Sequence, residues 1–346
     1  MDEIFSEIRL GETKHVIIAG AAHYYNDIAL LVDALVTSNR NVILSGTNLD
    51  IHGQPYGSMP DLMALADEVI LTKGPCFKYE TNCNVTEANR SVHLQNGEWA
   101  AACAHHFEYP DLPPLATEHL SFFTLYLGCM TSGKTKRWRR KILNLRKKGK
   151  EPLVFSPIKA ARYSEEEQEV PVYSAGKVTL NNAENFPAIL IKVAEDIDKY
   201  LFTHRQQRDI FLDEVQFIPG LYGLIQKYIP QGYRFYGTGL PRGFNRQGFN
   251  EVPRLMSLAD EIEMSYATCV KCGHPATENQ RMKRVAEGTE ERVVEAHVSD
   301  PLEIPGGMDK GKERYFYEAR CLKDWKLSGT SSQDNKYYLE RLKFKR

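Results

Sequence analysis

The residues with the clearest chemical meaning form a glycine-rich segment that follows an apolar, aromatic run. Gly128, Gly133, Lys134 and Thr135 stand in the order Gly-x-x-x-x-Gly-Lys-Thr directly after SFFTLYL. In this pattern the glycines let backbone N–H groups wrap phosphate oxygens, the lysine neutralises their charge, and the hydroxyl reaches Mg²⁺. Because the segment stands between a run typical of a strand and a run typical of a helix, the sequence predicts nucleotide binding.

A second chemical feature is a pair of carboxylates at the end of an apolar run. DIFLDEVQF (209–217) predicts a buried strand that ends at Asp213 and Glu214. Beside a phosphate loop, Asp213 is placed to hold a metal ion, directly or through water. Glu214 is then free to act as a general base on an incoming hydroxyl. Solvated loop acids are the alternative, but the strand and the phosphate loop together favour a P-loop nucleotidase or kinase core.

The segment after the phosphate loop, KTKRWRRKILNLRKKGK (134–150), is strongly basic and has no acidic residue. One interpretation is nucleic-acid binding. The other is a helix with a solvated basic face, because Trp138, Ile142 and Leu145 form an i, i+4, i+7 apolar stripe. The absence of further basic clusters favours the second interpretation.

The bulk composition is that of an ordinary globular chain. The 346 residues are 42% apolar and 26% charged, with a formal net charge of −1, so no overall field directs the chain to nucleic acid or to a membrane. The acidic start lacks the order of a signal peptide, and no apolar run is long enough to cross a bilayer. The seven cysteines, an odd number, suit a reducing compartment. We therefore expect a cytoplasmic protein.

The segments expected to position these residues belong to an internal sequence repeat. PDLMALADEV (60–69) and PRLMSLADEI (253–262) are identical at seven of ten positions, and TEANR (86–90) recurs as TENQR (277–281). A repeat of about 90 residues is too long for a solenoid unit and indicates a duplicated part of a domain. In both copies short β-branched runs alternate with helical patterns, which predicts a parallel α/β sheet.

The order of the motifs resembles the type II thymidine kinases. Between residues 122 and 326 the chain carries GCMTSGKT, ARY, DEVQF, GTGLPRGFNRQGFNEVPRLMSLADEI, CVKCGHPATENQR and ARCLKDW, in that order. The resemblance implies a RecA-like P-loop parallel sheet with a small zinc-bearing subdomain and a lasso loop that closes over the nucleoside. It also implies ATP-dependent phosphorylation of thymidine, and of deoxyuridine, to the 5′-monophosphate in nucleoside salvage for DNA synthesis.

The resemblance assigns roles to individual residues. Glu214 matches the base that takes the proton from the deoxyribose 5′-hydroxyl, and Arg162 matches an arginine at the transferred phosphate, where a fork of donors suits developing charge. The matches for ATP and Mg²⁺ are Gly128, Met130, Ser132, Gly133, Lys134, Thr135 and Asp213. The matches for the nucleoside are Met130, Phe217, Leu240, Phe244, Phe249 and Tyr317.

Three phenylalanines in this region could also be simple core residues. The spacing of Phe244 and Phe249 in a glycine-rich segment fits neither a helix nor a strand, which favours a ligand lid. Two positions depart from the family, since Ala160 and Pro241 stand where aspartate is common. Neither departure removes the base or the phosphate loop, so we expect activity, with a changed rate or nucleoside preference.

Zinc ligands are expected in both copies. Cys269 and Cys272 have ligand spacing and Cys321 follows, and the resemblance adds Asp324 where the family usually has Cys or His. Reduced thiols without metal are the alternative. In the first copy, where Cys76 aligns with Cys269, the residues of a second possible site are Cys76, Cys83, Cys103 and His106. Metal-free surface or buried side chains explain this second set equally well.

The sequence thus predicts four segments. Residues 1–112 form a degenerate partial repeat, 113–118 a linker, 119–326 the kinase domain, and 327–346 a flexible basic tail. At the places of Asp213 and Glu214 the first copy has Ala19 and Gly20, and no phosphate loop precedes them, so we expect it to be catalytically inactive. We favour a packing role for it, as a pseudo-subunit in a homo-oligomer; nucleoside binding at its GQPYG loop is the alternative.

The expected substrates are thymidine and ATP, with Mg²⁺ and structural Zn²⁺ as metal ions and with neither membrane nor nucleic acid as a partner. Two other classes of function compete. One is a non-catalytic nucleotide-binding regulator on the same scaffold, and the other is a RecA-like ATPase that acts on DNA. Glu214 favours the kinase over the regulator, and the zinc and lasso motifs favour it over the ATPase.

Overall fold

The computed structural model describes residues 14–20, 27–78, 88, 90–94, 98–103, 106–107, 122–158, 175–179, 185–287, 290–303, 309–310 and 313–329. The predicted linker, the tail beyond residue 329, and three residues singled out above (Cys83, Ala160 and Arg162) lie outside these residues. Across the described residues, no helix is long and apolar enough to cross a membrane.

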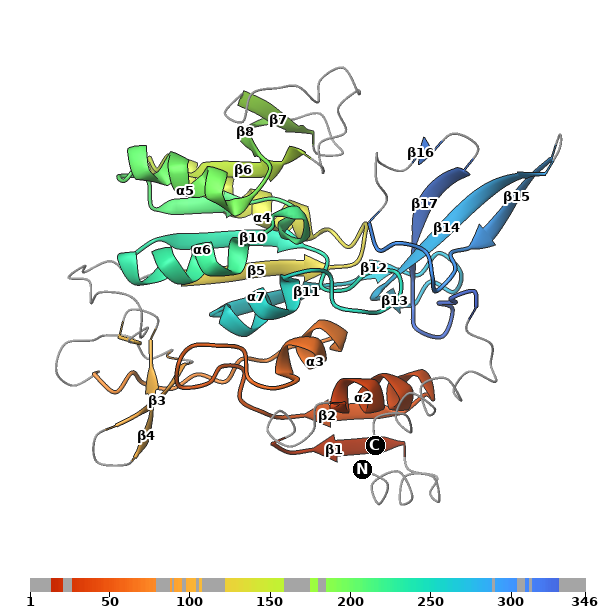
Figure 1. Cartoon of the computed structure of the whole chain (residues 1–346), viewed down its shortest axis with the longest axis horizontal. Coiled ribbons are helices and arrows are strands. Elements are labelled where there is room, and N and C mark those ends of the chain that lie inside the picture. The colour runs from red at the N-terminus through yellow and green to blue at the C-terminus, as the bar shows by residue number, and fades with distance from the viewer. Residues whose placement is uncertain are drawn as a thin grey trace.

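The second half of the chain is built on a seven-stranded sheet in the order β11-β5-β10-β9-β6-β8-β7 (Figure 1). Its strands are β5 (Phe122–Gly128), β6 (Leu153–Pro157), β7 (Ala175–Thr179), β8 (Asn185–Ile191), β9 (Asp209–Leu212), β10 (Arg234–Gly239) and β11 (Glu261–Ser265). Six strands are parallel, and β7 pairs antiparallel with β8 at the edge. The predicted parallel α/β sheet is therefore confirmed.

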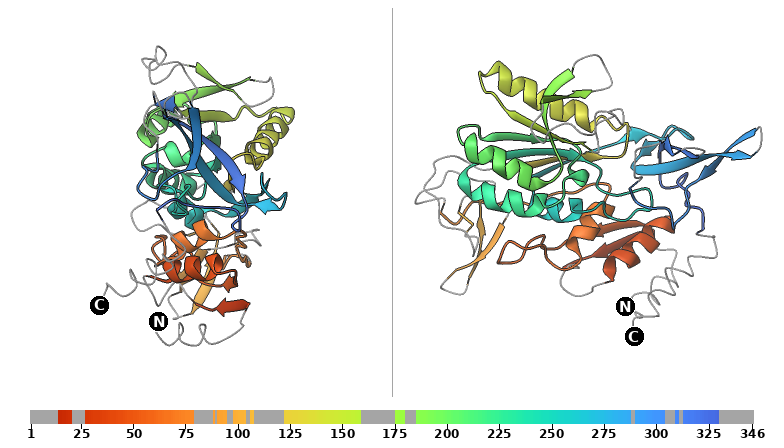
Figure 2. Two further views of the ribbon diagram at one scale, coloured as in Figure 1. Left: turned by 90° about the vertical axis from the view of Figure 1, so that its right-hand side faces the viewer. Right: turned by 45° about the horizontal axis from the view of Figure 1, so that its top comes forward.

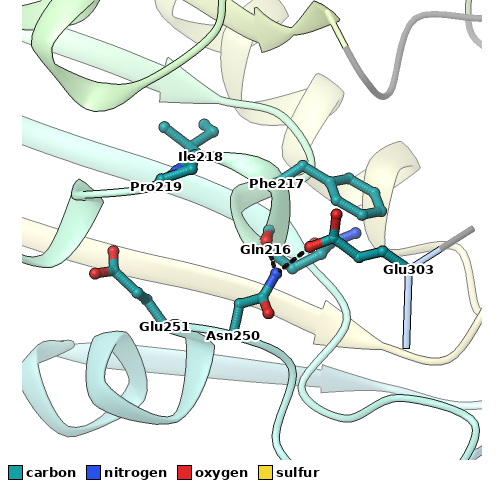
Figure 3. A pocket seen from close by; sticks show the side chains of 7 residues that line it. All are labelled: Gln216, Phe217, Ile218, Pro219, Asn250, Glu251 and Glu303. Atoms are coloured by element: carbon teal, nitrogen blue, oxygen red, sulfur yellow. Dashed lines mark hydrogen bonds between the residues drawn. The ribbon is translucent and has the colours of Figure 1, made fainter. Parts of the chain in front are cut away.

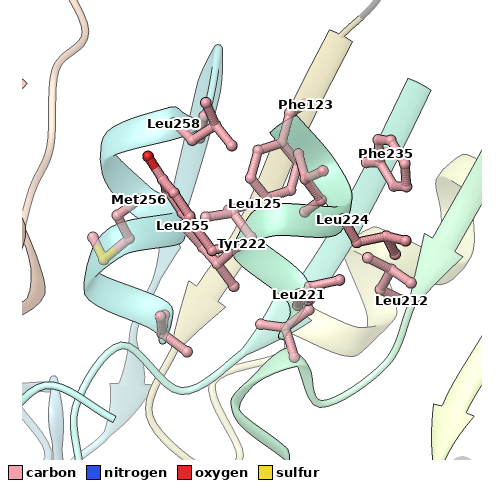
Figure 4. Packing of buried hydrophobic residues seen from close by; sticks show 14 of the residues in the cluster. Phe123, Leu125, Leu212, Leu221, Tyr222, Leu224, Phe235, Leu255, Met256 and Leu258 are labelled. Atoms are coloured by element: carbon pink, nitrogen blue, oxygen red, sulfur yellow. The ribbon is translucent and has the colours of Figure 1, made fainter. Parts of the chain in front are cut away.

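Helices cover both faces of this sheet, which explains why its central strands read as continuous apolar runs. The helical elements are α4 (Lys134–Lys147), α5 (Ala194–Thr203), η4 (Val215–Phe217), α6 (Leu221–Tyr228), η5 (Ile229–Gln231) and α7 (Val252–Leu258). Phe123 and Leu125 of β5 point to the face covered by α5, α6 and α7 (Figure 4). Tyr126 points to the opposite face, where it packs with Trp138 of α4.

The basic helix α4 is anchored by its apolar stripe. Trp138, Ile142 and Leu145 are all buried, and the indole N–H of Trp138 donates to the carbonyl of Tyr236 at 2.8 Å. Arg140 and other basic side chains of the helix face solvent, whereas Lys134 at its N-terminus is buried. The predicted amphipathic helix is confirmed.

A small antiparallel subdomain stands beside the main sheet (blue in Figures 1 and 2). It contains β12 (Ala267–Thr268), β13 (Pro275–Ala276), β14 (Glu278–Glu287), β15 (Glu290–Glu295), β16 (Asp309–Lys310) and β17 (Glu313–Arg320). The strands β12 and β13 pair with each other, and the other four form a sheet in the order β15-β14-β17-β16.

The N-terminal half packs against α7 (red and orange in Figure 1). Its elements are β1 (His15–Ile18), α2 (Ile28–Thr37), β2 (Asn41–Leu44), α3 (Met59–Leu65), β3 (Arg90–His93) and β4 (Trp99–Ala102). β1 and β2 are parallel, whereas β3 and β4 are antiparallel. The two repeated phrases form α3 and α7, which pack on each other and end at Ala66 and Ala259 with the same φ of −66° and ψ of 142°.

Candidate active site

The glycine-rich loop joins the end of β5 to the N-terminus of α4, as the sequence predicts. Gly128 has φ of 154°, and a Cβ added there would lie 2.4 Å from the backbone O of Ser265. Gly133, with φ of 84°, is left-handed immediately before α4, a conformation that glycine adopts at little cost. The loop therefore brings its backbone to a helix N-terminus, where N–H groups and the helix dipole favour phosphate.

Two side chains of the loop fit a bound phosphate group. Ser132 Oγ is buried and has no hydrogen-bond partner within the described part of the chain, so a ligand oxygen would satisfy it. Lys134 is only 7% exposed, and its ammonium donates to the carbonyl of Cys129 at 3.3 Å. One carbonyl leaves two of its three donors for phosphate oxygens. Thr135 follows as the second residue of α4 and is half-buried.

Asp213 lies at the carboxyl end of β9, next but one to β5 in the sheet. Its backbone N–H donates to Phe155 O at 2.9 Å, and Ser156 Oγ donates to its carboxylate at 3.4 Å. Burial raises the pKa of Asp213, and the neighbouring Glu214 raises it further, to about 7, although Lys134 acts in the opposite direction. A divalent cation would neutralise this buried carboxylate, so the residue fits a Mg²⁺ ligand.

Glu214 follows in a strained conformation, with φ of 43° and ψ of 56°. A non-glycine residue in the left-handed region costs about 1–2 kcal/mol, and such strain persists only where the surroundings fix it. The side chain of Glu214 is held by the carboxamide of Gln216, whose Nε2 donates to Glu214 Oε2 at 2.5 Å. Glu214 stays half-buried, so its carboxylate is held in place without being sealed from a substrate.

A cavity of about 300 Å³ is lined by Gln216, the residue that contacts Glu214 (Figure 3). Its lining residues are Gln216, Phe217, Ile218, Pro219, Asn250, Glu251 and Glu303. The ring of Phe217 meets that of Phe249 edge to face at 5.5 Å, and the half-buried Leu240 begins the loop that ends near Asn250. Three of the predicted nucleoside-binding residues therefore gather around Gln216.

The other predicted nucleoside-binding residues form a second group. Phe244 is buried against Ala296 and Leu327, with Tyr317 packed on the same cluster. The guanidinium of Arg281 lies 3.9 Å from the centroid of the Phe244 ring and donates to Tyr317 Oη at 2.7 Å. Met130, at the phosphate loop, is tied to the small subdomain because its backbone N–H donates to Asn279 Oδ1 at 2.8 Å.

Cys269, Cys272, Cys321 and Asp324 converge as predicted, with ligand atoms within 4.8 Å of one another. Cys269 Sγ and Cys321 Sγ each lie 3.3 Å from the carboxylate of Asp324, and the sulfurs of Cys272 and Cys321 are 3.5 Å apart. Tetrahedral zinc with Zn–S bonds of about 2.3 Å places its sulfur ligands about 3.8 Å apart. The donor set therefore fits a structural zinc ion that joins β12, β13 and the end of β17.

In the N-terminal half, Cys76, Cys103 and His106 also converge. His106 Nδ1 lies 3.6 Å from Cys76 Sγ and 3.3 Å from Cys103 Sγ. Cys83, the fourth expected ligand, lies outside the described residues. Three donors fit part of a zinc site, and a fourth ligand is needed to close it.

Several residues of the site carried no clear signal in the sequence. Gln216, Asn250 and Arg281 contact the residues named above. Each lies in a motif in which other residues have the clearer chemical role. The signal available for Gln216 was its position, two residues after Glu214 in a segment that is otherwise apolar, because a buried carboxamide needs partners.

The arrangement of the site and a comparison with known families together define the class of the protein. The phosphate loop and the carboxylate pair lie at the carboxyl edge of one parallel sheet, which is the arrangement of P-loop kinases. A family model for thymidine kinase matches residues 2–106 and 121–310, which is most of the chain. The chain belongs to the thymidine kinase family, a family of enzymes that phosphorylate nucleosides.

Proposed function

We propose that the chain transfers the γ-phosphoryl group of ATP to the 5′-hydroxyl of thymidine, with deoxyuridine as a second acceptor. The observation that carries the proposal is the placement of Asp213 and Glu214 beside the phosphate loop. One carboxylate is buried with a raised pKa and suits a cation, while its neighbour is half-buried and suits a base. Positioning and electrostatic stabilisation of this kind supply most of phosphoryl-transfer catalysis.

The roles follow from the positions of the residues. ATP with Mg²⁺ supplies the phosphoryl group when bound. The backbone of residues 128–133 and the ammonium of Lys134 hold its phosphates, and Asp213, with Thr135, holds the metal ion. Glu214 takes the proton of the acceptor hydroxyl. Arg162 lies outside the described residues. We assign to it the stabilisation of the negative charge that develops on the transferred phosphoryl group.

We assign the acceptor to the cavity of Figure 3, which Phe217 and Gln216 line, with Phe249 packed on Phe217 and Leu240 bonded to Gln216. The ring pair Phe217–Phe249 offers the apolar wall that a base needs. Phe244 and Tyr317 are assigned to the support of the same loop from the small subdomain. Five of the six residues expected at the nucleoside are thus divided between wall and support, and Met130 stays at the phosphate loop.

We infer further that the N-terminal half is a degenerate copy that acts as a pseudo-subunit. Repeat-related helices α3 and α7 pack on each other, as equivalent surfaces do in an isologous dimer. The contacts at their ends are reciprocal. Arg242 donates to the carbonyls of Ala64 and Leu65 at 3.0 and 2.6 Å at the end of α3.

The reverse contact comes from the N-terminal half. Arg90 donates to Leu258 O at 3.3 Å at the end of α7 and forms a 2.5 Å ion pair with Asp260. Each half thus places an arginine on the C-terminal carbonyls of the other half's helix, where a cation is favoured by the helix dipole. This exchange supports a packing role for residues 1–112. The Ala19–Gly20 pair in place of the two carboxylates supports a half without catalysis.

The test is ATP-dependent conversion of thymidine to its monophosphate by the full chain, with deoxyuridine and deoxycytidine as comparison acceptors. Loss of a general base lowers rates by about 10²–10⁴-fold, so Glu214→Gln should lose that much kcat. Glu261→Gln, an exposed residue at the start of β11, is the matched control and should keep parental turnover. ATP binding without turnover on any nucleoside would replace the proposal with a nucleotide-binding regulator.

A further inference from the structure

The carboxamide of Gln216 is the link between the proposed base and the loop of residues 240–250. Its side chain is buried, with 3% of its surface exposed. Nε2 donates to Glu214 Oε2 at 2.5 Å, and Oε1 accepts from the backbone N–H of Leu240 at 3.2 Å. One side chain thus joins a carboxylate on the β9 edge to the first residue of a loop that follows β10.

The two partners fix which way this carboxamide points. A backbone N–H only donates, and a carboxylate only accepts, so the amide oxygen must face Leu240 and the NH₂ group must face Glu214. Reversing the amide would break both hydrogen bonds and leave a buried donor against a donor. The loop amide therefore determines that a donor is presented to Glu214.

The fold makes room for this link and ties it to both ends of the loop. A Cβ on Gly239 would lie 2.6 Å from Gln216 Oε1, so only glycine lets the end of β10 approach so closely. At the other end, Asn250 Nδ2 donates to the backbone O of Gln216 at 2.8 Å and to Glu303 at 2.6 Å. Gln216 and Asn250 both line the cavity (Figure 3).

We propose that Gln216 is a positioning residue that couples the placement of the loop 240–250 to the orientation of Glu214. With the loop seated, Leu240 holds the amide oxygen, the amide NH₂ group holds Glu214 Oε2, and Oε1 of Glu214 is left for the acceptor hydroxyl. With the loop displaced, the carboxamide is free to turn and the carboxylate loses its fixed orientation. The inference rests on the proposed function for the role of Glu214, while the contact with Leu240 stands without it.

Two substitutions separate the two hydrogen bonds. Gln216→Met removes both bonds in a side chain of similar length. Gln216→Glu keeps an acceptor for Leu240 and replaces the amide donor to Glu214 with a second carboxyl group, which disturbs the charge of Glu214. Gln231→Met is the control, because this glutamine of η5 donates to Lys227 O of α6 at 3.0 Å and is not among the residues that line the cavity.

The first measurement is steady-state kinetics on the full chain. A hydrogen bond to a charged group is worth roughly a 10- to 100-fold change in rate. Both Gln216 variants should lose kcat by that factor with an unchanged KM for ATP, and only Gln216→Met should also raise the KM for thymidine. If Gln216 acts through Glu214, the loss of kcat should vanish when Gln216→Met is made in the Glu214→Gln background. A loss of kcat under twofold, or the same loss in both backgrounds, overturns the proposal.

The second measurement is hydrogen–deuterium exchange of the Leu240 amide, read on peptides that differ at this residue. Exchange should accelerate roughly 5- to 10-fold in Gln216→Met, as expected for loss of one hydrogen bond, and should stay slow in Gln216→Glu and in the control. Unchanged exchange in Gln216→Met overturns the proposed link. This readout needs no turnover, so an inactive parent would refute the proposed function while the exchange data still decide the role of Gln216.

Discussion

Glu278 is the centre of a buried ion network that joins the loop 240–250 to the N-terminal half. Its carboxylate accepts from Arg242 Nη2 at 2.6 Å and forms a short ion pair with Arg246. Arg246 also pairs with Asp33 of α2 at 2.8 Å. Only about 1% of the Glu278 side chain is exposed, so solvent does not screen these pairs. We predict that Glu278→Gln is strongly destabilising, because it leaves two buried guanidinium groups short of countercharge.

The magnitude follows from the pKa of Glu278. Burial raises this pKa, but the charges of Arg242 and Arg246 more than offset that effect and lower it from 4.5 to about 2. At 1.36 kcal/mol per pH unit this depression corresponds to roughly 3 kcal/mol of folding free energy at pH 7. Because the folded-state pKa is the lower one, the stabilisation is present above the unfolded pKa of 4.5. It is lost as pH falls toward 2, and about 1.4 kcal/mol should remain at pH 3.

The assay is urea unfolding of the full chain at pH 7, 4.5 and 3, with Glu261→Gln as an exposed control. Glu278→Gln should lose roughly 3 kcal/mol at pH 7 and progressively less as pH falls, because the parent carboxylate is itself being protonated. The control should stay within about 0.5 kcal/mol of the parent. A loss below about 1 kcal/mol at pH 7, or a difference that does not shrink between pH 4.5 and 3, would refute the reasoning.

Three further predictions concern the site and its metals. Gly128→Ala should weaken ATP binding by at least about 100-fold, since its Cβ would meet Ser265 O at 2.4 Å. The control is Gly223→Ala, where a Cβ meets nothing within 4 Å. Equal ATP affinities of the two variants in calorimetry would contradict the prediction. The raised pKa of Asp213, about 7, means that Mg²⁺ must displace a proton below that pH. The Mg²⁺ affinity should therefore fall by up to about tenfold per unit as pH drops below 7, and Asp213→Asn should abolish that dependence in the same titration. Asp324→Ala should lower the zinc content of the purified chain, measured by elemental mass spectrometry, because a four-ligand site loses one donor; full retention of zinc would show that Asp324 is not a ligand.

The sequence was most informative where function depends on short spacing. The phosphate loop and the carboxylate pair each occupy a few consecutive residues, so strand and helix geometry alone carries them to a sheet edge. The stripe of Trp138, Ile142 and Leu145 was equally readable, because helical periodicity places its members on one face.

The sequence was less informative about the loop phenylalanines. Phe249 joins Phe217 beside the cavity, whereas Phe244 turns into the small subdomain under Arg281. Their spacing in a glycine-rich segment fits no regular period, so neither burial nor direction can be read from it. The small subdomain decides the position of Phe244, and its strands come later in the chain.

The sequence by itself therefore predicted the chemical groups of the site: a phosphate loop, a pair of adjacent carboxylates, and a set of cysteines with ligand spacing. Only the tertiary structure decided how these parts are joined. The contact of Arg242 with Ala64 spans 178 residues of chain, and that of Gln216 with Leu240 spans 24. Such contacts depend on how α3 packs on α7 and how closely β10 approaches η4. Packing of this kind is set by the shapes of many side chains together, and no local pattern records it.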